Sequence, residues 1–408
     1  MPPALRRMLD FLALPGAALL AALLFQQAAD PEWGSLFAAL PWLVCLAGAA
    51  IAWRFRVGNM VMVFVALAAV HGLLEQTGRA PFTADTLRFG AAWYWPIMVA
   101  CLATLPERGL FNRPGLERVA FIVYPALIIL AHAANGQPTP SWVRTLLVNT
   151  AATRLHLPDA ALVFTVIAAG CLLWQFRRRA TPLETGLLTV LLLAMVGIAL
   201  GDNRVYRAIY FSTAGAALIV ALIQNSYRVA FHDELTGLPG RRALKSLLTT
   251  VGDRYVIAML DVDHFKKFND TYGHDVGDQV LCRVGRVISN VTGGGHYFRY
   301  GGEEFTVVFP NRSLREALPH LDAVCSAMAA TPFTVRSKDR PEAKPDGSAP
   351  TPDAAKASGT QVTITISIGA AEKSPRYEDW EAVMKAADQA LYKAKQAGRN
   401  RVMADGQK

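Results

Sequence analysis

The sequence predicts a polytopic, all-α membrane domain followed by an α+β domain, and three observations support this division. First, the 408-residue chain is 52% hydrophobic and only 18% charged, which is unusual for a protein that is soluble throughout. Second, the hydrophobic excess is local, and residues 1–230 contain no lysine. Third, short strand and helix patterns alternate after about Ser226. We therefore expect a membrane domain over residues 1–225, a short linker over 226–232 and a second domain over 233–408.

Apolar runs in the first domain are long enough to cross a bilayer, which requires roughly 20 mostly apolar residues per helix. They are apolar on every face, whereas a buried helix of a soluble protein seldom is. Residues 141–157, between two runs, have the spacing of a short amphipathic helix outside the membrane. We expect about eight spans: Leu9–Phe25, Leu36–Trp53, Gly58–Leu74, Phe89–Leu105, Arg118–Ala134, Ala160–Phe176, Thr185–Leu200 and Tyr206–Gln224.

The placement of arginine predicts the orientation of these spans. Residues 1–230 hold 17 Arg against 10 Asp and Glu, and the arginines gather in alternate loops, for example at Arg177–Arg179. Cytoplasmic loops carry such an excess, so both termini are expected in the cytoplasm. The alternative is that Arg6, Arg7 and the first run form a cleaved signal peptide, which leaves seven spans and still a cytoplasmic C-terminus.

Composition also argues against other functions. The net charge of +9 lies mostly in loops between apolar runs, so we expect no nucleic-acid binding. The five cysteines have no metal-ligand spacing and indicate small buried side chains in a reducing compartment. His71 and His132 lie in or beside spans and are either ligands of a metal or haem, or polar residues in helix packing. The absence of a spacing motif favours packing.

The second domain has the pattern of an antiparallel sheet covered by helices. Residues 337–360 are rich in Pro, Ala, Ser, Lys and Asp and indicate a flexible insert between two strands. The expected strands are Tyr255–Leu260, His296–Arg299, Phe305–Phe309, Phe333–Arg336 and Val362–Ile368. The expected helices are Val276–Ile288, Ser313–Ala330 and Trp380–Gln396.

Two acidic clusters lie at the ends of predicted strands in this domain. One is Asp261-Val262-Asp263, and the other is Glu303-Glu304, which follows Gly301 and Gly302 at a hairpin turn. Mg²⁺ takes one or two protein carboxylates and completes its shell with water and phosphate oxygens. Two such ions can activate a hydroxyl and stabilise a leaving pyrophosphate. Acids are also common at turns, so either cluster alone is a weak signal.

Taken together, these residues resemble the GGDEF diguanylate cyclase family, as a variant with a GGEEF signature. The resemblance covers about two fifths of the chain, from Asp233 to Met403, and its motifs occur in the family's order. They are DELTGLPGRR at 233–242, DVDHFKKFNDTYGHDVGD at 261–278, RYGGEEF at 299–305, SIGA at 367–370 and ALYKAKQAGRN at 390–400. The family's fold is similar to the nucleotidyl cyclase and polymerase palm.

The resemblance implies an activity and roles for the matching positions. The activity is condensation of two GTP to cyclic di-GMP and two pyrophosphates across a homodimer, with two Mg²⁺ per active site or Mn²⁺ as a substitute. The metal ligands would be Asp261, Glu303 and the Val262 carbonyl, and Glu304 would complete the catalytic group. The implied GTP-binding residues are Phe265, Lys266, Asn269, His274, Asp278, Gly301, Gly302, Lys395 and Arg399. Asn269 and Asp278 would contact the guanine, with His274 nearby, and the three cations would hold phosphates. Lys395 and Arg399 would lie on one helix face if the last helix reaches Arg399.

The resemblance also implies the setting of the activity. A bacterial inner-membrane protein is expected, with its catalytic domain in the cytoplasm, in signalling that regulates biofilm or motility. The lipid bilayer and an unidentified signal ligand would be partners of the membrane domain. Many relatives carry an RxxD product-inhibition site, but Thr292 and Gly295 stand at those positions, so we expect little inhibition there. The alternatives are a silent GTP- or cyclic-di-GMP-binding module, and a transporter or receptor with a soluble appendage.

Overall fold

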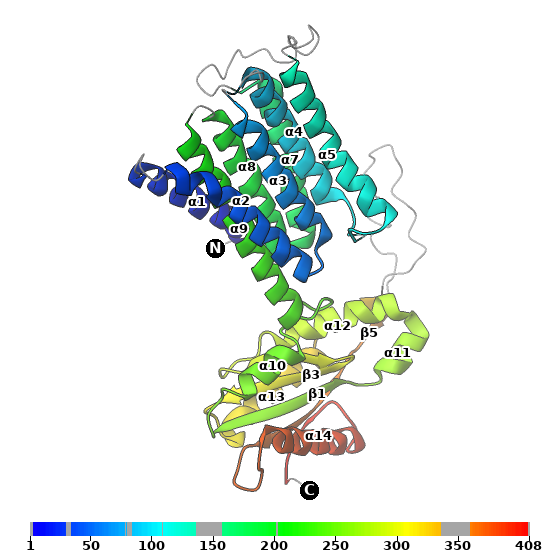
Figure 1. Cartoon of the computed structure of the whole chain (residues 1–408). Helices are drawn as coiled ribbons and strands as arrows, with labels where there is room; N and C mark the ends of the chain where they lie inside the picture. The colour runs from blue at the N-terminus through cyan, green and yellow to red at the C-terminus, as the bar shows by residue number, and fades with distance from the viewer. Residues whose placement is uncertain are drawn as a thin grey trace. The chain divides into compact units, whose positions relative to one another are not determined.

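A computed structural model describes residues 3–29, 34–77, 79, 84–107, 109–135, 157–200, 203–335 and 360–406 (Figure 1). The chain divides into two compact units, Met1–Tyr227 and Arg228–Lys408. The predicted amphipathic helix at 141–157 and the predicted insert at 337–360 fall almost entirely outside the described residues. Each unit has its own hydrophobic core, as expected for two folding domains.

The first unit is a helical bundle (Figure 1). Its described helices are α1 (Pro3–Ala28), α2 (Gly34–Arg54), α3 (Gly58–Glu75), α4 (Ala84–Thr104), α5 (Arg113–Ala134), α7 (Asp159–Arg179), α8 (Pro182–Ala199) and α9 (Arg204–Phe231). Helices α3, α8 and α9 are mostly buried inside the unit, whereas α1, α2, α5 and α7 expose most of their apolar side chains. Exposed apolar faces of this extent are compatible with a lipid environment.

Among the described residues, seven helices are long and apolar enough to cross a membrane. They are α1, α2, α3, α5, α7, α8 and α9, and they are compatible with a multi-pass membrane protein. Helix α4, predicted as the fourth span, forms but does not reach the same hydropathy. Its centre holds Trp93, Tyr94, Trp95 and Pro96, which are less apolar than aliphatic residues.

Polar side chains lie inside the first unit as well. His71 on α3 is only 1% exposed and packs between the rings of Trp42 and Phe211, each 5.4 Å from it between ring centroids. One turn further along α3, Glu75 forms an ion pair of 2.6 Å with Arg207 on α9. These ring contacts are what the packing interpretation of His71 expects.

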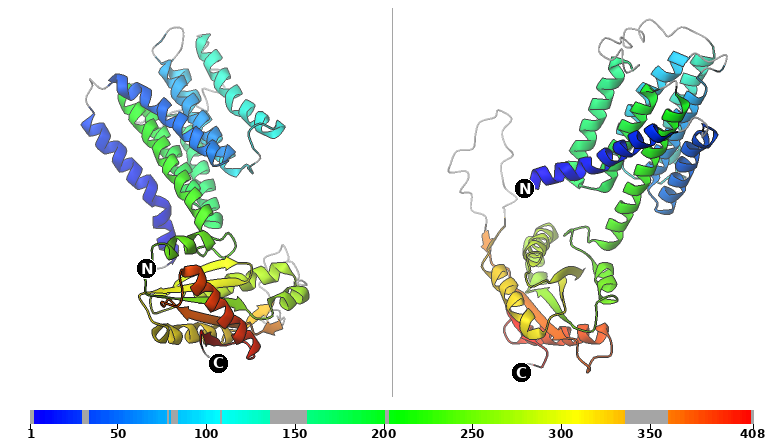
Figure 2. Two further views of the ribbon diagram at one scale, coloured as in Figure 1. Left: turned by 60° about the horizontal axis from the view of Figure 1, so that its bottom comes forward. Right: turned by 90° about the vertical axis from the view of Figure 1, so that its left-hand side faces the viewer.

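The second unit is an α+β domain, as predicted, with helices on both faces of a five-stranded sheet (Figure 2). The strands lie in the order β2-β3-β1-β6-β7, with every neighbouring pair antiparallel except β6 and β7. The strands are β1 (Tyr255–Val262), β2 (His296–Gly301), β3 (Glu304–Pro310), β6 (Ile366–Glu372) and β7 (Val402–Ala404), with a separate β4 (Phe333–Val335) and β5 (Thr360–Val362) pair. The helices are α10 (Arg241–Leu248), α11 (Phe265–Tyr272), α12 (His274–Ile288), α13 (Leu314–Ala329) and α14 (Trp380–Gln396).

The central strand β1 is buried along its whole length and supplies both cores of the unit. Successive side chains of a strand point to opposite faces. Val256, Ala258 and Leu260 therefore pack with α12 and α13 on one face, whereas Ile257 and Met259 pack with α10 and α14 on the other. By the same alternation the side chain of Asp261 points to the α10 and α14 face. Its carboxylate can therefore contact residues of those helices rather than α12 or α13.

One local prediction was wrong. The predicted strand Val362–Ile368 is two strands, because β5 ends at Val362 and pairs with β4, while β6 begins at Ile366 and pairs with β1. The pattern along the chain shows where apolar residues alternate but not which neighbour each segment pairs with. Helix α9 continues to Phe231 and so includes most of the residues expected as a short linker, 226–232.

Candidate functional site

The two acidic clusters are brought together by the pairing of β1 with β3. Asp261 lies directly opposite Glu304 in the antiparallel register, and Glu303 occupies the turn that precedes β3. Residues opposite one another on neighbouring strands have Cβ atoms roughly 5 Å apart. The side chain of Asp261 is 9% exposed, and Glu303 and Glu304 are half-buried. Carboxylates separated by about forty residues in the sequence thus share one end of the sheet.

Lys395 reaches this cluster from α14. Its Nζ lies 2.8 Å from Oδ1 of Asp261, and its side chain is 31% exposed. Asp388 lies seven residues earlier on the same helix, which is two helical turns and so the same helix face. Asp388 therefore adds a fourth carboxylate near the cluster, and nothing in the sequence pattern distinguished it from an ordinary solvated helix residue.

The electrostatics of the cluster favour a bound cation. Burial, and after it the nearby negative charge of Asp261, raises the pKa of Glu303 and the pKa of Glu304. Burial also raises the pKa of Asp261, although the hydrogen bond from Lys395 works against this shift. A single ammonium group does not balance three carboxylates, and a divalent cation would relieve their repulsion.

The donor set fits Mg²⁺ in number and type. Among the described residues no group of three His, Cys, Asp or Glu side chains could by itself hold a metal ion. Mg²⁺ does not need one, since it commonly binds one or two carboxylates together with waters and substrate phosphates. Asp261 and Glu303 are the carboxylates that would hold such an ion, and the Val262 carbonyl is adjacent in the chain.

The glycine hairpin is held by Arg299. Gly302 has a φ of +49°, in the region that favours glycine, and begins the turn between β2 and β3. The carbonyl oxygen of Gly302 accepts hydrogen bonds from Nε and from one terminal nitrogen of Arg299, at 3.1 and 2.7 Å. The other terminal nitrogen of Arg299 forms an ion pair of 2.6 Å with Asp233. Arg299 thus ties the turn that carries Glu303 to the segment after α9.

Asp233 organises that segment. Its Oδ1 accepts hydrogen bonds from both the backbone N–H and the hydroxyl of Thr236, at 2.8 and 2.7 Å, in addition to Arg299. Burial opposes the ionisation of Asp233, but these hydrogen bonds outweigh it, and the pKa is lowered from its ordinary value. The carboxylate of Asp233 is consequently a stabilising anion at neutral pH.

We predict that Asp233→Ala lowers the free energy of unfolding by about 2 kcal/mol at neutral pH, the scale of a partly buried, charge-assisted hydrogen bond. Because the folded-state pKa of Asp233 is lowered, its contribution is present above pH 4 and disappears as the pH falls further. The difference between the unfolding midpoints of the variant and the wild type should therefore narrow at acidic pH. Glu234→Ala, an exposed neighbour, is the control; an equal loss in that variant would contradict the assignment.

Asn269 and Asp278, which the resemblance assigns to guanine, lie on neighbouring helices. Asn269 is on α11 and its Oδ1 is buried without a hydrogen-bond partner among the described residues. Asp278 is on the first turns of α12 and is exposed, as is His274 at the start of that helix. A Cβ atom at Gly277 would lie 1.9 Å from the Asn269 oxygen, so the glycine provides the space that this amide occupies.

The remaining predicted site residues have different surroundings. Phe265 is 7% exposed and packs into the core on the α12 and α13 side, whereas Lys266 is exposed. The structure does not bring Arg399 onto one helix face with Lys395, because α14 ends at Gln396 and Arg399 has a φ of +61°. Gly398, with a φ of +110°, allows the chain to turn there, so Arg399 is presented by a loop.

Asp263 is a positioning residue that the sequence did not distinguish from Asp261. Its carboxylate accepts hydrogen bonds from the hydroxyls of Thr365 and Ser367, at 2.7 and 2.6 Å, and from the backbone N–H of Asn400 at 3.1 Å. The side chain is therefore occupied by the protein itself. Through Asn400, Asp263 fixes the loop that carries Arg399.

Thr292 and Gly295, at the positions expected for a product-inhibition motif, lie in the loop between α12 and β2. The Thr292 hydroxyl lies 2.7 Å from Nδ1 of His320 on α13. Neither residue supplies the charged groups of an RxxD motif.

Comparison with known proteins places the second unit. Residues 230–344 and 348–401 match the family described as diguanylate cyclase, GGDEF domain. The second unit is therefore similar to GGDEF diguanylate cyclase domains, and we call it the GGDEF unit. The response regulator PleD of Caulobacter vibrioides is 35% identical over 190 residues, covering 44% of this chain and 37% of PleD. The diguanylate cyclase VdcA of Vibrio cholerae is 36% identical over 178 residues, covering 43% of this chain and 47% of VdcA.

A solved structure also shows similarity to this chain. The coiled coil and GGDEF domain of DgcB from Caulobacter crescentus, in complex with c-di-GMP, is 32% identical, with a TM-score of 0.37. The match covers 45% of this chain and 89% of that one. Of the two curated relatives, PleD and VdcA, the chain spans less than half the length.

Proposed function

We propose that this protein is a diguanylate cyclase that condenses two GTP molecules into cyclic di-GMP. Each 3′-hydroxyl attacks the α-phosphate of the other GTP, one phosphodiester bond forms per attack, and one pyrophosphate leaves. The observation that carries the proposal is the pairing of Asp261 with Glu304 across β1 and β3, in a domain of the GGDEF family, with Lys395 beside it. Every catalytic residue type that the resemblance implies is present.

The residues divide the work as follows. Bound Mg²⁺ or Mn²⁺ would lower the pKa of the attacking hydroxyl and stabilise charge on the phosphates. Asp261, Glu303 and the Val262 carbonyl would hold the ions, with Glu304 completing the negative charge. Lys395, now paired with Asp261, would turn to phosphate oxygens, joined by Lys266 and Arg399.

Guanine would be selected beside α11 and α12. The oxygen of Asn269, which has no hydrogen-bond partner among the described residues, can accept a hydrogen bond from the base, and the exposed carboxylate of Asp278 can accept two. Adenine does not present the same pair of donors. Phe265 and Gly301 would shape the site, while His274 lies at its edge.

The reaction needs two such sites facing each other, so we propose a homodimer through the GGDEF unit. We further propose that the first unit is a multi-pass domain of a bacterial inner membrane, which localises or regulates the enzyme in response to a signal still to be found. The seven long apolar helices and the alternation of arginine-rich loops support this placement.

The deciding experiment uses the full chain purified in detergent or nanodiscs. With GTP and Mg²⁺ we expect cyclic di-GMP and pyrophosphate in a ratio of about one to two, as the stoichiometry of the condensation requires. Removal of the metal by a chelator should abolish product, and ATP should give none. Folded, dimeric protein that binds GTP with Mg²⁺ but forms no product would instead identify a silent GTP-binding module.

Gly277 gives a second test, specific for the guanine site. We expect Gly277→Ala to weaken GTP affinity at least tenfold, because the new methyl group would displace the Asn269 amide, 1.9 Å away. The contact is with the end of a flexible side chain, so the unfolding midpoint should change little. Equilibrium binding of 3′-deoxy-GTP measures the effect. If the Asn269 side chain moved in Gly277→Ala but the affinity for 3′-deoxy-GTP did not change, Asn269 would not be part of the guanine site.

A further inference from the structure

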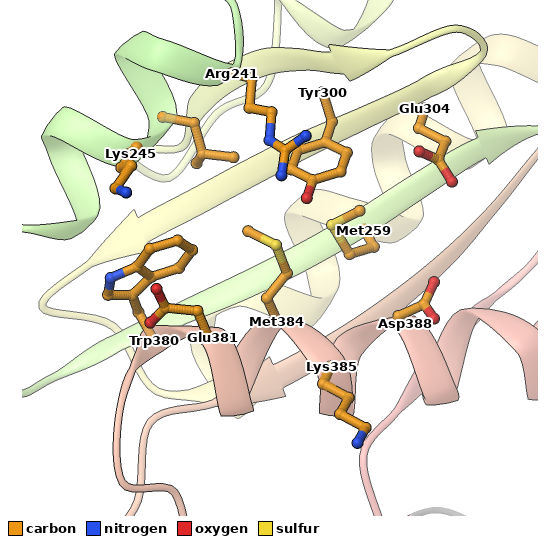
Figure 3. A pocket seen from close by; sticks show the side chains of 11 residues that line it. Arg241, Lys245, Met259, Tyr300, Glu304, Trp380, Glu381, Met384, Lys385 and Asp388 are labelled. Carbon is orange, nitrogen blue, oxygen red and sulfur yellow. The ribbon is translucent and has the colours of Figure 1, made fainter.

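A groove crosses the sheet face between α10 and α14 (Figure 3), and nothing in the proposed reaction requires it. Its volume is about 590 Å³, within the range of small-molecule sites. We call it the α10–α14 groove. Among the residues that line it are Arg241, Lys245, Tyr300, Trp380, Glu381 and Asp388. Glu304 and Asp388 also lie at the carboxylate cluster, whereas Asp261, Glu303 and Lys395 do not line the groove.

The floor of the groove consists of aromatic and methionine side chains. Tyr300 and Trp380 supply aromatic rings, and Met259 and Met384 supply thioethers between them (Figure 3). Tyr300, Trp380 and Met384 keep part of their surface open to solvent. Such a floor favours a planar ring system, which can stack on aromatic groups and cover exposed apolar area.

The two walls carry opposite charges that do not neutralise each other. Arg241 and Lys245 project from α10, while Glu381 and Asp388 project from α14 (Figure 3). Within the part of the chain that the structure describes, these four side chains form no ion pair with one another, and the guanidinium of Arg241 lies 4.8 Å above the centre of the Tyr300 ring. Lys385 also lines the groove, but its ammonium end points away from these four side chains (Figure 3).

We infer that the α10–α14 groove is a second binding site for a guanine nucleotide. A ligand that satisfies both walls needs an anionic group for Arg241 and Lys245, a planar centre for the floor, and adjacent N–H donors for a carboxylate on the other wall. A guanine nucleotide has all three: its phosphates suit Arg241, its base stacks, and its N1–H and N2–H₂ groups match the two oxygens of one carboxylate. The inference goes beyond the proposed catalysis, because the groove contains neither Asn269 nor Asp278.

The test counts nucleotides on the full chain in nanodiscs with 3′-deoxy-GTP, which cannot be condensed. We expect two sites per chain in the wild type. In Arg241→Gln/Lys245→Gln, one of the two should weaken at least tenfold, and the same should hold for Glu381→Gln or Asp388→Asn. All these side chains are exposed, so the fold should persist. Lys385→Gln, on the same helix but pointing away, is the matched control and should retain both sites.

Trp380 provides a local readout, since it is the only tryptophan in residues 228–408. Binding in the groove should quench a fluorescence component that is missing from Trp380→Phe. Asn269→Ala/Asp278→Ala should abolish the other site and leave this quenching intact. One site in the wild type, lost in Asn269→Ala/Asp278→Ala, would overturn the inference. If binding were lost in Arg241→Gln/Lys245→Gln but not in Asn269→Ala/Asp278→Ala, the groove would remain a nucleotide site. The proposed substrate site at Asn269 and Asp278 would then be refuted.

The side chains of the groove suit both GTP and cyclic di-GMP, because both contain guanine and phosphate. A competition experiment distinguishes the two ligands. Competition at the Trp380 signal by cyclic di-GMP at lower concentration than GTP would identify product as the ligand; the reverse order would identify substrate. Both support a guanine site. Equal competition by 3′-deoxy-ATP would overturn it, because adenine lacks the paired donors that the carboxylate wall requires.

Discussion

Glu303→Ala/Glu304→Ala is expected to abolish cyclic di-GMP formation, with a loss of at least about a thousandfold in turnover. Each carboxylate lies at the end of β3 beside Asp261, where the proposed metal ions would bind. A metal ion contributes several kcal/mol to stabilising a charged transition state, and about 4 kcal/mol corresponds to a thousandfold in rate. The proposed guanine residues are untouched, so metal-free 3′-deoxy-GTP binding should persist.

We also predict how the same variant changes the unfolding midpoint. Burial and the charge of Asp261 raise the pKa of both glutamates, which means that their ionised forms are disfavoured in the metal-free fold. Their removal should leave the metal-free unfolding midpoint unchanged or higher. Mg²⁺ should raise the midpoint of the wild type, because a ligand of the folded state stabilises it, and should not raise that of the variant.

Glu378→Ala is the matched control, since Glu378 is an exposed glutamate of the same unit outside the cluster. It should retain both cyclase activity and the Mg²⁺ effect. If Glu303→Ala/Glu304→Ala kept either of them, the metal site would have to lie away from the hairpin.

Gly369→Ala is expected to be the most destabilising methyl addition in the GGDEF unit, at about 3 kcal/mol or more. Gly369 lies on β6 under α14, and a Cβ there would fall 2.0 Å from the backbone nitrogen of Leu391 and 2.2 Å from the carbonyl oxygen of Ala387. Backbone atoms of a packed helix cannot rotate away, so α14 would have to lift from the sheet. Lys395 and Asp388 would move with it, and activity should fall together with stability.

Thermal unfolding of the full chain, followed through the fluorescence component that is missing from Trp380→Phe, measures this loss. Gly252→Ala is the control, because nothing lies within 4 Å of a Cβ at that loop position and its backbone is not in the left-handed region. Its free energy of unfolding should stay within about 0.5 kcal/mol of that of the wild type. A Gly369→Ala protein as stable as Gly252→Ala would show that α14 is less tightly seated on β6 than these distances require.

Local pattern was sufficient for much of the fold. The run Tyr255–Leu260 is apolar and β-branched, and it forms β1; the glycines at 301 and 302 form the hairpin between β2 and β3. The predictions failed where contacts between distant segments, rather than the local pattern, determine the structure. Val362–Ile368 alternates as one strand would, yet its two ends join different sheets. Arg399 follows Lys395 at helical spacing, but Gly398 ends the helical path between them.

Residue types and short-range spacing were enough to predict the available chemistry: carboxylates at two strand ends, a glycine turn, cations near the C-terminus, and long apolar helices before them. These features depend on interactions over a few residues. The folded arrangement was needed to find that Asp261 faces α14 and contacts Lys395, that Asp263 instead binds the backbone N–H of Asn400, and that Arg299 joins Asp233 to the turn. Each of these contacts joins residues at least 66 positions apart, where strand parity and helix packing, not local propensity, set the partner.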